Sequence, residues 1–176
     1  ETLGSTTVIC TDKTGTLTEN QMTVKQVYLS NGIVYEVCGN GYNPQGEFLE
    51  NGSPINPSEH KDLVSFLIAG VLSSNASLIK ENDIYKIIGD PTEGGIVVMG
   101  KKAQIDRDSL SQKGFERIGE IPFNSKDKFM VTAYETKPEG KKLFIKGAPD
   151  IVLQMSNLDK DSLEKYLKLN EKIAYE

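Results

Sequence analysis

The stretch "FERIGEIPFNSKDKFMVTAYETKPEGKKLFIK", Phe115–Lys146, contains three runs that are rich in β-branched and aromatic residues. The runs cover residues 115–123, 129–136 and 143–146, and the turn sequence "KPEG" separates the second from the third. Short runs of this composition, bounded by turn residues, are typical of β-strands joined in hairpins. The stretch therefore predicts antiparallel strands.

Helix start signals precede these strands in the chain. The run "NPSEHKDLVSFLIAGVLSSNASL" begins with Asn56 as an N-cap, Pro57 at the first helical position and Glu59 three residues after the cap. The run "DPTEGGIVVMGKKAQI" repeats the signal, with Asp90 as the cap and Glu93 three residues later. We expect each run to form a helix.

The remaining segments complete an α+β pattern. Strand-like runs at residues 22–30 and 33–39 flank Asn31-Gly32, a dipeptide suited to a tight hairpin turn. Residues 40–55 are rich in Gly, Pro and Asn, so we expect a surface loop. A further strand is predicted at "YKIIG", and further helices at "DRDSLSQ", "PDIVLQMS" and "DSLEKYLKLNEKIAYE". The predicted fold is α+β, a mostly antiparallel β-sheet flanked by helices.

The N-terminal piece has a different organisation. Residues 6–11, "TTVICT", predict a short buried strand that ends at Asp12. Because a lone strand cannot be a domain, we expect residues 1–20 to open a domain whose remainder lies elsewhere in a longer chain.

Composition excludes several classes of protein. The chain has 176 residues and a net charge of -5, which argues against a nucleic-acid surface because phosphate backbones are bound by excess Lys and Arg. His60 is the only histidine, so a histidine-centred hydrolase or a zinc site is not expected. Cys10 and Cys38 lack metal-ligand spacing, which favours reduced thiols. No apolar run is long enough to span a bilayer, so we expect a soluble piece that makes no membrane contact.

The loop after the predicted first strand has the residues for phosphoryl chemistry. A carboxylate at the carboxyl end of a strand, followed by a glycine-containing loop, lies where α/β sheets usually place ligands. Asp12 can attack phosphorus to form an acyl phosphate, while Lys13 and the hydroxyls of Thr14 and Thr16 can bind phosphate oxygens. The structural alternative, an aspartate in an ordinary turn, stays open for so short a string.

The residue two positions after Asp12 decides how long such an intermediate would last. A second aspartate there could protonate the leaving group and then activate water against the acyl phosphate. This chain has Thr14, a poor acid and base, at that position. A phospho-aspartate should therefore persist, which suits a machine that couples the phosphorylated state to a conformational change.

Four motifs in order resemble those of one family, the P-type cation-transporting ATPases. "DKTGT", Asp12–Thr16, is similar to the phosphorylation signature of the family. "GDPTEGGI", "FNSKDKFM" and "KGAPD" are similar to motifs of its nucleotide-binding domain. The variants "ENQMTV" and "FNSKDKFM" look most like the calcium-transporting branch.

The resemblance implies a domain organisation. Residues 1–20 would be a fragment of the phosphorylation domain, with one strand and loop of its Rossmann-like sheet. Residues 21–176 would be the nucleotide-binding domain, an antiparallel sheet flanked by helices, truncated at its C-terminal end.

The resemblance also implies an ATP pocket. The residue matching Phe123 stacks on adenine in the family, those matching Lys128 and Lys146 line the same pocket, and the one matching Glu93 bonds to the adenine amino group. Gly147 would let the backbone approach the ligand closely. The structural alternatives are a core position for Phe123, solvated strand-edge positions for the two lysines and a capping box for Glu93.

Magnesium, in the whole enzyme, would contact Asp12 and the carbonyl of Thr14, so the site in this chain would be half built. The implied cofactors are ATP and Mg²⁺. The implied partners are the remaining phosphorylation, actuator and transmembrane domains of a membrane-embedded pump, with this piece at its cytoplasmic face. We expect this piece to bind ATP without efficient turnover.

Two other functions fit part of the sequence. A soluble phosphatase of the same nucleophile class would use Asp12, although such an enzyme should carry an aspartate at position 14. A non-catalytic nucleotide-binding module would leave Asp12 idle. The transported ion is not encoded here, because selectivity resides in transmembrane helices.

Overall fold

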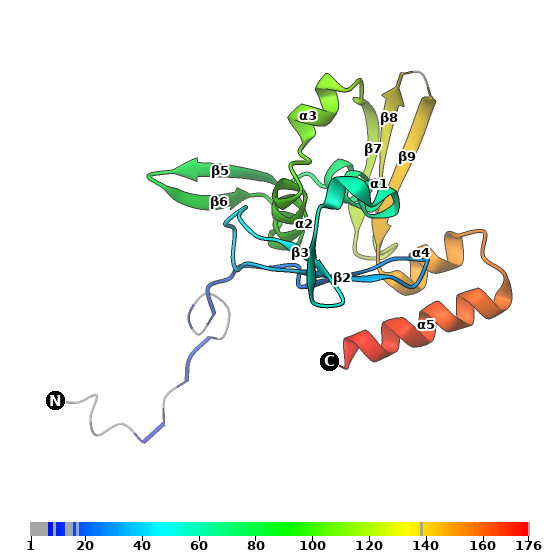
Figure 1. Ribbon diagram of the computed structural model, residues 1–176. Coiled ribbons are helices and arrows are strands. Elements are labelled where there is room, and N and C mark those ends of the chain that lie inside the picture. Colours follow the sequence, from blue (N-terminus) through cyan, green and yellow to red (C-terminus); the bar gives the residue numbers. More distant parts are fainter. Residues whose placement is uncertain (1–6, 9, 13–15, 17, 138, 176) are drawn as a thin grey trace. The chain divides into compact units, whose positions relative to one another are not determined.

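The computed structural model describes residues 7–8, 10–12, 16, 18–137 and 139–175. The chain divides into two compact units, residues 1–55 with 75–102 and residues 56–74 with 103–176, here called the first and the second unit. The class is α+β, with three antiparallel sheets and five α-helices in the described residues, so the predicted class is confirmed (Figure 1). No helix in the described part of the chain is long and apolar enough to cross a membrane.

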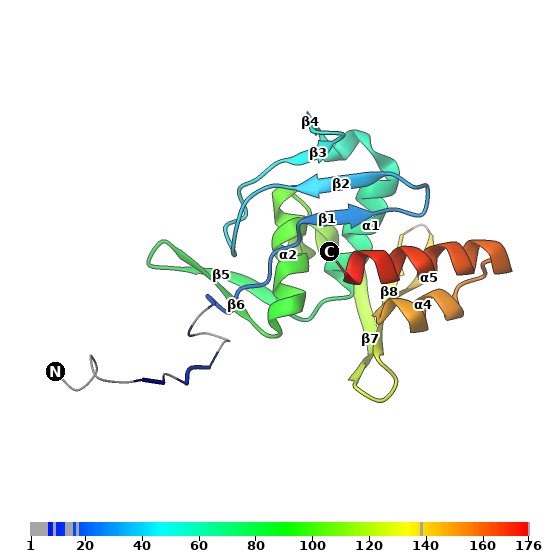
Figure 2. The ribbon, with the colours of Figure 1, turned by 90° about the horizontal axis from the view of Figure 1, so that it is seen from below.

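The first unit contains a four-stranded antiparallel sheet with the strand order β1-β2-β3-β4. Its strands are β1 (Gln26–Tyr28), β2 (Val34–Val37), β3 (Phe48–Glu50) and β4 (Ser53–Ile55). The predicted hairpin at Asn31-Gly32 is confirmed, since β1 and β2 pair antiparallel and Gly32 has a φ of 86°. Figure 2 shows β1, β2 and β3 lying side by side.

The loop predicted for residues 40–55 is wrong in its second half, which forms the β3–β4 hairpin. Asn51 and Gly52 have φ values of 50° and 77°, as a type I′ turn requires. Pro54 is tolerated because β4 lies at the edge of the sheet, where a missing N–H leaves no ladder bond unmade. The Phe48 side chain is only 1% exposed, so this hairpin contributes to the core.

The first unit also contains helix α2 (Pro91–Lys102) and a second hairpin, β5 (Ser77–Glu81) with β6 (Ile84–Ile88). The predicted strand at "YKIIG" is β6. Its partner β5 was not predicted, because residues 77–78 were assigned to the preceding helix. The glycines of α2 allow close packing: a Cβ on Gly94 would lie 2.6 Å from the Ile87 side chain.

The second unit is built on a three-stranded antiparallel sheet, β7-β8-β9, here called sheet C. Its strands are β7 (Glu116–Asn124), β8 (Phe129–Thr136) and β9 (Gly140–Gly147), which confirms the three predicted runs. The helices of this unit are α1 (Lys61–Leu72), α3 (Arg107–Gln112), α4 (Pro149–Met155) and α5 (Lys160–Ala174). Figures 1 and 2 both show α4 and α5 side by side.

Helix α1 packs its apolar side on one face of sheet C. Val71 and Leu72 of α1, Leu110 of α3 and Tyr134 of β8 form a buried cluster. The predicted start signal is used differently from the expectation: Asn56 caps a 3₁₀ turn (Pro57–Glu59), and α1 begins at Lys61.

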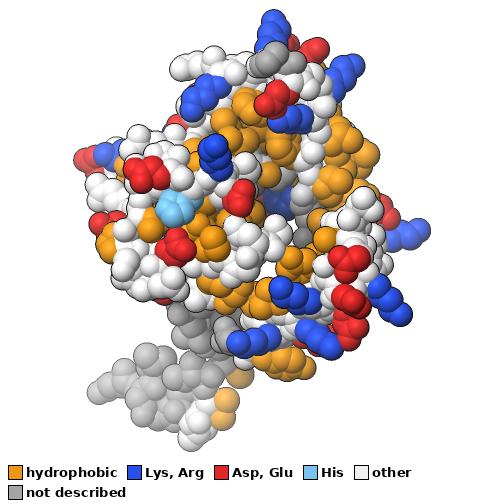
Figure 3. Space-filling model, turned by 45° about the vertical axis from the view of Figure 1, so that its right-hand side comes forward, with side chains coloured by type: hydrophobic (Ala, Val, Ile, Leu, Met, Phe, Trp, Pro, Cys, Tyr) orange, Lys and Arg blue, Asp and Glu red, His pale blue; other side chains and the backbone are white. Residues whose placement is uncertain are grey.

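The other face of sheet C carries exposed apolar side chains. Ile121, Val131 and Ile145 are aligned across the three strands, and Leu143 is 66% exposed. The space-filling view shows hydrophobic side chains exposed on the face in view, with charged side chains of both signs around them (Figure 3).

The strand predicted for residues 6–11 is not formed by the described residues of that stretch. Thr7, Val8, Cys10 and Thr11 are exposed and have no regular secondary structure. A strand is held by ladder bonds to a neighbour, and the described residues offer none to this segment. The division of the chain into residues 1–20 and 21–176 stays a prediction.

Candidate functional site

Four of the predicted site residues lie at one end of sheet C. The backbone positions of Asn124, Phe129 and Gly147 pair across the three strands, forming a row, here called the terminal row. Phe123 and Lys128 immediately precede the first two members of the row, and Lys146 immediately precedes the third. The fold therefore brings the backbone positions of these residues to the same end of the sheet, although they are up to 23 residues apart in the sequence.

Phe123 is not a core residue. Its side chain is 60% exposed near the end of β7. By contrast, the aromatic pair Tyr134 and Phe144 of the same sheet packs edge to face, with ring centroids 5.8 Å apart. The core alternative for Phe123 is therefore wrong, and its ring is accessible to a planar ligand.

Lys128 ends the turn between β7 and β8. Asn124 organises this turn: its carbonyl accepts a hydrogen bond from Lys128 N at 2.7 Å, and its Oδ1 accepts one from Lys126 N at 2.9 Å. Lys128 adopts the left-handed region with a φ of 58°, which is uncommon for a non-glycine residue. Its side chain is exposed, as the structural alternative expected.

Lys146 has a different environment from Lys128. It pairs with Met130 of β8, which is 1% exposed, so both side chains point to the face of sheet C that α1 covers. Its Nζ lies 3.5 Å from Oγ of the buried Ser74, two residues beyond the end of α1. Lys146 is half-buried, so the alternative of a solvated strand-edge lysine is wrong.

Gly147 is required by the chain's own packing. A Cβ at this position would lie 2.5 Å from the carbonyl oxygen of Lys128 and 2.8 Å from Cα of Phe129. The same Lys128 carbonyl accepts a hydrogen bond from Ala148 N at 2.9 Å. The close approach predicted for Gly147 is thus made by neighbouring backbone.

Glu93 lies in the first turn of α2, in the first unit. Asp90 caps the helix as predicted, because its Oδ1 accepts hydrogen bonds from Thr92 N at 2.8 Å and Glu93 N at 3.1 Å. The Glu93 carboxylate reaches another segment: its Oε2 accepts hydrogen bonds from Asn75 N at 2.6 Å and Ala76 N at 3.0 Å. This structural function was not anticipated, because the partners are 17 and 18 residues away.

Asp12 is exposed, and its backbone carbonyl accepts a hydrogen bond from Thr11 Oγ1 at 3.2 Å. Thr14, the other predicted magnesium ligand, lies outside the described residues. Across the described ranges, no group of three or more His, Cys, Asp or Glu side chains is arranged to hold a metal ion. The two proposed oxygen donors would therefore supply part of a coordination shell.

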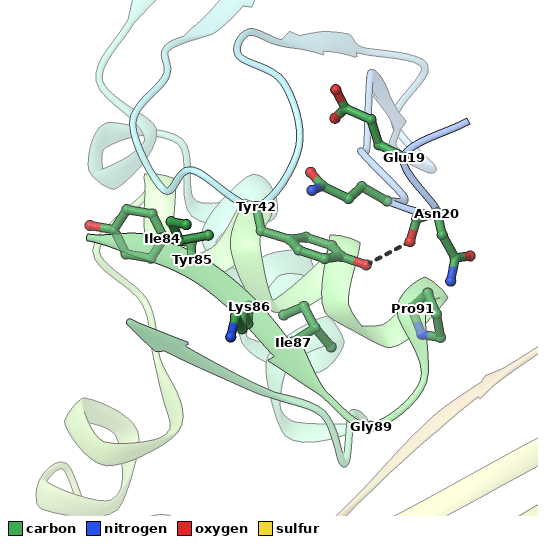
Figure 4. A pocket seen from close by; sticks show the side chains of 10 residues that line it. Glu19, Asn20, Tyr42, Ile84, Tyr85, Lys86, Ile87, Gly89 and Pro91 are labelled. Carbon is green, nitrogen blue, oxygen red and sulfur yellow. Dashed lines mark hydrogen bonds between the residues drawn. The ribbon is translucent and has the colours of Figure 1, made fainter. Parts of the chain in front are cut away.

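The first unit has a hollow of about 430 Å³ (Figure 4). The Tyr42 ring lies in it, with the Tyr42 hydroxyl donating a hydrogen bond to the carbonyl of Asn20 at 3.4 Å. Ile87 and Pro91 line the same hollow. None of the predicted site residues lines it.

Comparisons with known proteins identify the family. Residues 62–175 match the family described as "P-type ATPase, cytoplasmic domain N". The chain is 38% identical over 157 residues to a calcium-transporting ATPase of Bacillus subtilis, covering 89% of this chain and 17% of that protein. It is 40% identical over 160 residues to the cation-transporting ATPase pma1 of Synechocystis sp., covering 88% and 17%. It is 36% identical over 157 residues to the calcium-transporting ATPase type 2C member 1 of Bos taurus, covering 88% and 16%.

The chain therefore belongs to the P-type cation-transporting ATPases and contains their cytoplasmic domain N. It spans about one sixth of the length of these curated relatives. The family predicted from the four motifs is confirmed.

Proposed function

We propose that this chain binds ATP in a P-type cation pump and positions the nucleotide so that its γ-phosphate passes to Asp12. The observation that supports the proposal is the terminal row of sheet C, because Phe123, with its exposed ring, and the lysines Lys128 and Lys146 each precede a member of this row. An exposed aromatic face suits a base, and nearby ammonium groups suit phosphates.

Each predicted site residue has a distinct task in the proposed complex. Phe123 stacks on the adenine ring, Lys128 lies near the base and the phosphates, and Lys146 lies at the inner wall of the pocket. Gly147 keeps the backbone of β9 close to the turn that carries Lys128, which supports its assignment to the site. Glu93 accepts from the adenine amino group, directly or through water.

The proposed chemical step is a phosphoryl transfer. A carboxylate oxygen of Asp12 forms a bond to the γ-phosphorus while the bond to the bridging oxygen breaks, and ADP leaves with that oxygen. The carboxylate of Asp12 and the carbonyl of Thr14 are hard oxygen donors of the kind that Mg²⁺ prefers, and water and phosphate oxygens would complete its shell. Because Thr14 is a poor acid and base, the residue at position 14 does not speed hydrolysis of the phospho-aspartate.

In the parent protein, the phosphorylated state would drive cation transport across a membrane. The printed names of two relatives, which call them calcium-transporting, favour calcium as the cation. The remaining phosphorylation domain, the actuator domain and the transmembrane domain would be the partners, with this chain on the cytoplasmic side. The 176-residue chain alone would bind ATP without efficient turnover.

ATP titration of the 176-residue chain by calorimetry tests the binding proposal. We expect a Kd on the order of 0.1 to 1 mM, because stacking and a few lysines must offset association costs of at least about 4 kcal/mol. Phe123→Ala should weaken binding by roughly 5-fold to 150-fold, as expected for the loss of about 1 to 3 kcal/mol of stacking. Ile121→Ala is the control, since Ile121 is 59% exposed on the same strand. Equal affinities of the two variants would refute the stacking function.

Labelling of the full-length pump with γ-labelled ATP tests the chemical step. The expected product is an acid-stable, hydroxylamine-labile label that disappears in Asp12→Asn. ATP binding without any label would favour the non-catalytic nucleotide module. Release of phosphate from small phosphoesters by the wild-type chain would favour the phosphatase.

A further inference from the structure

Ser74 is a buried serine with every polar group engaged. It is 0% exposed and follows α1 in the second unit. Its backbone N–H donates to the carbonyl of Val71 at 3.3 Å, and its own carbonyl accepts from the Arg107 guanidinium at 2.5 Å. Side chains held this firmly pre-organise the groups that they contact.

The orientation of the Ser74 hydroxyl follows from its acceptor. Ser74 Oγ donates its single proton to the carbonyl of Gly70 at 2.8 Å. The lone pairs of the oxygen are therefore available as acceptors, and the Lys146 Nζ lies 3.5 Å away. An ammonium group has three N–H donors, so this contact engages one of them.

The end of α1 also favours a cation at this place. The last carbonyls of a helix carry partial negative charge, and the final turn of α1 contains no basic residue of its own. Lys146 supplies a cation from β9, across 72 residues of sequence. Helix end and serine hydroxyl thus act on the same ammonium group.

We propose that Ser74 is a positioning residue for the nucleotide site: it holds the Lys146 ammonium group in place at the inner wall of the ATP pocket. This inference rests on the proposed function of Lys146 in ATP binding. Holding the lysine side chain in one place before the ligand arrives lowers the ordering cost of binding.

The chain contains a matched control. Ser73 is next to Ser74, is 2% exposed, and its Oγ also donates to the carbonyl of Gly70, at 3.2 Å. Ser73→Ala and Ser74→Ala therefore remove the same kind of helix-end hydrogen bond, but only Ser74→Ala removes the oxygen that lies beside Lys146. Ser74→Cys is a second variant. It nearly preserves the size of the side chain, but it replaces the hydroxyl by a thiol, which is only a weak acceptor.

The test is ATP titration of the chain in a double-mutant cycle of Ser74→Ala and Lys146→Met. We expect Ser74→Ala and Ser74→Cys to weaken ATP binding by about 3- to 10-fold, in line with the net contribution of one typical hydrogen bond. Ser73→Ala should leave the affinity unchanged, and Ser74→Ala should have no further effect once Lys146 is methionine. An equal loss in Ser73→Ala, or a loss that persists in the Lys146→Met background, would overturn the inference.

A nucleotide-free measurement separates this inference from the proposed function. In the wild type, the two ε-methylene protons of Lys146 should give separate NMR signals because the amine is held, and they should merge in Ser74→Ala but not in Ser73→Ala. If the signals stay separate in Ser74→Ala, the inference that Ser74 positions Lys146 fails, while the proposed function is unaffected. If Phe123→Ala and Lys146→Met both leave ATP binding unchanged, the proposed function fails, and the nucleotide part of this inference fails with it.

Discussion

Glu93 holds the backbone of Asn75, with 2.6 Å between its Oε2 and the Asn75 N–H nitrogen. The same oxygen accepts the N–H of Ala76, so one carboxylate satisfies two consecutive backbone donors. Ala76 is 1% exposed, and a buried N–H without an acceptor is costly. Glu93 therefore links the first turn of α2 to the segment that leads into β5.

Glu93→Ala should destabilise the chain even without nucleotide. Loss of the carboxylate leaves the Asn75 and Ala76 N–H groups without this acceptor, which should lower the free energy of unfolding by about 1 to 3 kcal/mol. Glu93→Gln keeps one carbonyl acceptor and should lose less. Urea unfolding of both variants measures the difference. An Ala variant as stable as the wild type would show that water replaces the carboxylate at no cost.

Thr132 and Tyr134 should stabilise the fold jointly, because both donate to one carbonyl. Thr132 Oγ1 and the Tyr134 hydroxyl lie 3.1 and 3.2 Å from the carbonyl oxygen of Leu72, at the end of α1. Burial raises the pKa of Tyr134, which keeps its hydroxyl protonated as a donor.

Thr132→Val and Tyr134→Phe each leave one donor for Leu72, so each should cost about 0.5 to 1.5 kcal/mol. The double variant strips the buried carbonyl of both side-chain donors and should cost more than the sum of the two. Urea unfolding of the four proteins in this cycle gives the coupling energy. Strict additivity would contradict the shared-acceptor interpretation.

Gly147→Ala should separate β9 from the turn before β8. The new Cβ would lie 2.5 Å from the Lys128 carbonyl oxygen, so the backbone must shift, at a cost of about 1 to 3 kcal/mol. Gly119→Ala in β7 is the control, since a Cβ there meets nothing within 4 Å. Thermal unfolding should show a clear loss for the first variant and little change for the second. Comparable melting temperatures would mean that the terminal row adapts without strain.

Lys102 should make the free energy of unfolding rise with pH in the interval just below pH 10.5. Its Nζ donates to the carbonyl of Cys38 at 2.6 Å, and its pKa is lowered below 10.5, first by burial and then by the Lys25 ammonium, while Cys38 opposes the shift. In the interval between the lowered pKa and 10.5, the unfolded state binds more protons than the folded state. The free energy of unfolding therefore increases with pH across that interval.

Lys25→Met removes the repelling charge, so the pKa of Lys102 should move back toward 10.5 and the pH dependence should weaken. An NMR titration of the Lys102 side chain measures the pKa, with Lys101→Met as the neighbouring control. An unchanged pKa in Lys25→Met would show that burial alone accounts for the shift.

Local signals in the sequence were sufficient for much of the fold. Asn31-Gly32 predicted its hairpin and Asp90 predicted its helix, since each acts on residues within three positions. The same signal was present at Asn51-Gly52 and was outweighed by the Gly, Pro and Asn content around it. Composition is a weaker guide than turn chemistry, because strands at a sheet edge tolerate such residues.

The sequence by itself determined the family, through four motifs in order, and most of the helices and strands, because these depend on spacing along the chain. Only the tertiary structure decided that α1 ends at Leu72, that Glu93 binds Asn75 and that Lys146 faces Ser74. The partners in these contacts are 18 and 72 residues apart. A half-buried carboxylate or ammonium group bonds to whichever donor or acceptor folding places beside it, and no local sequence pattern identifies that partner.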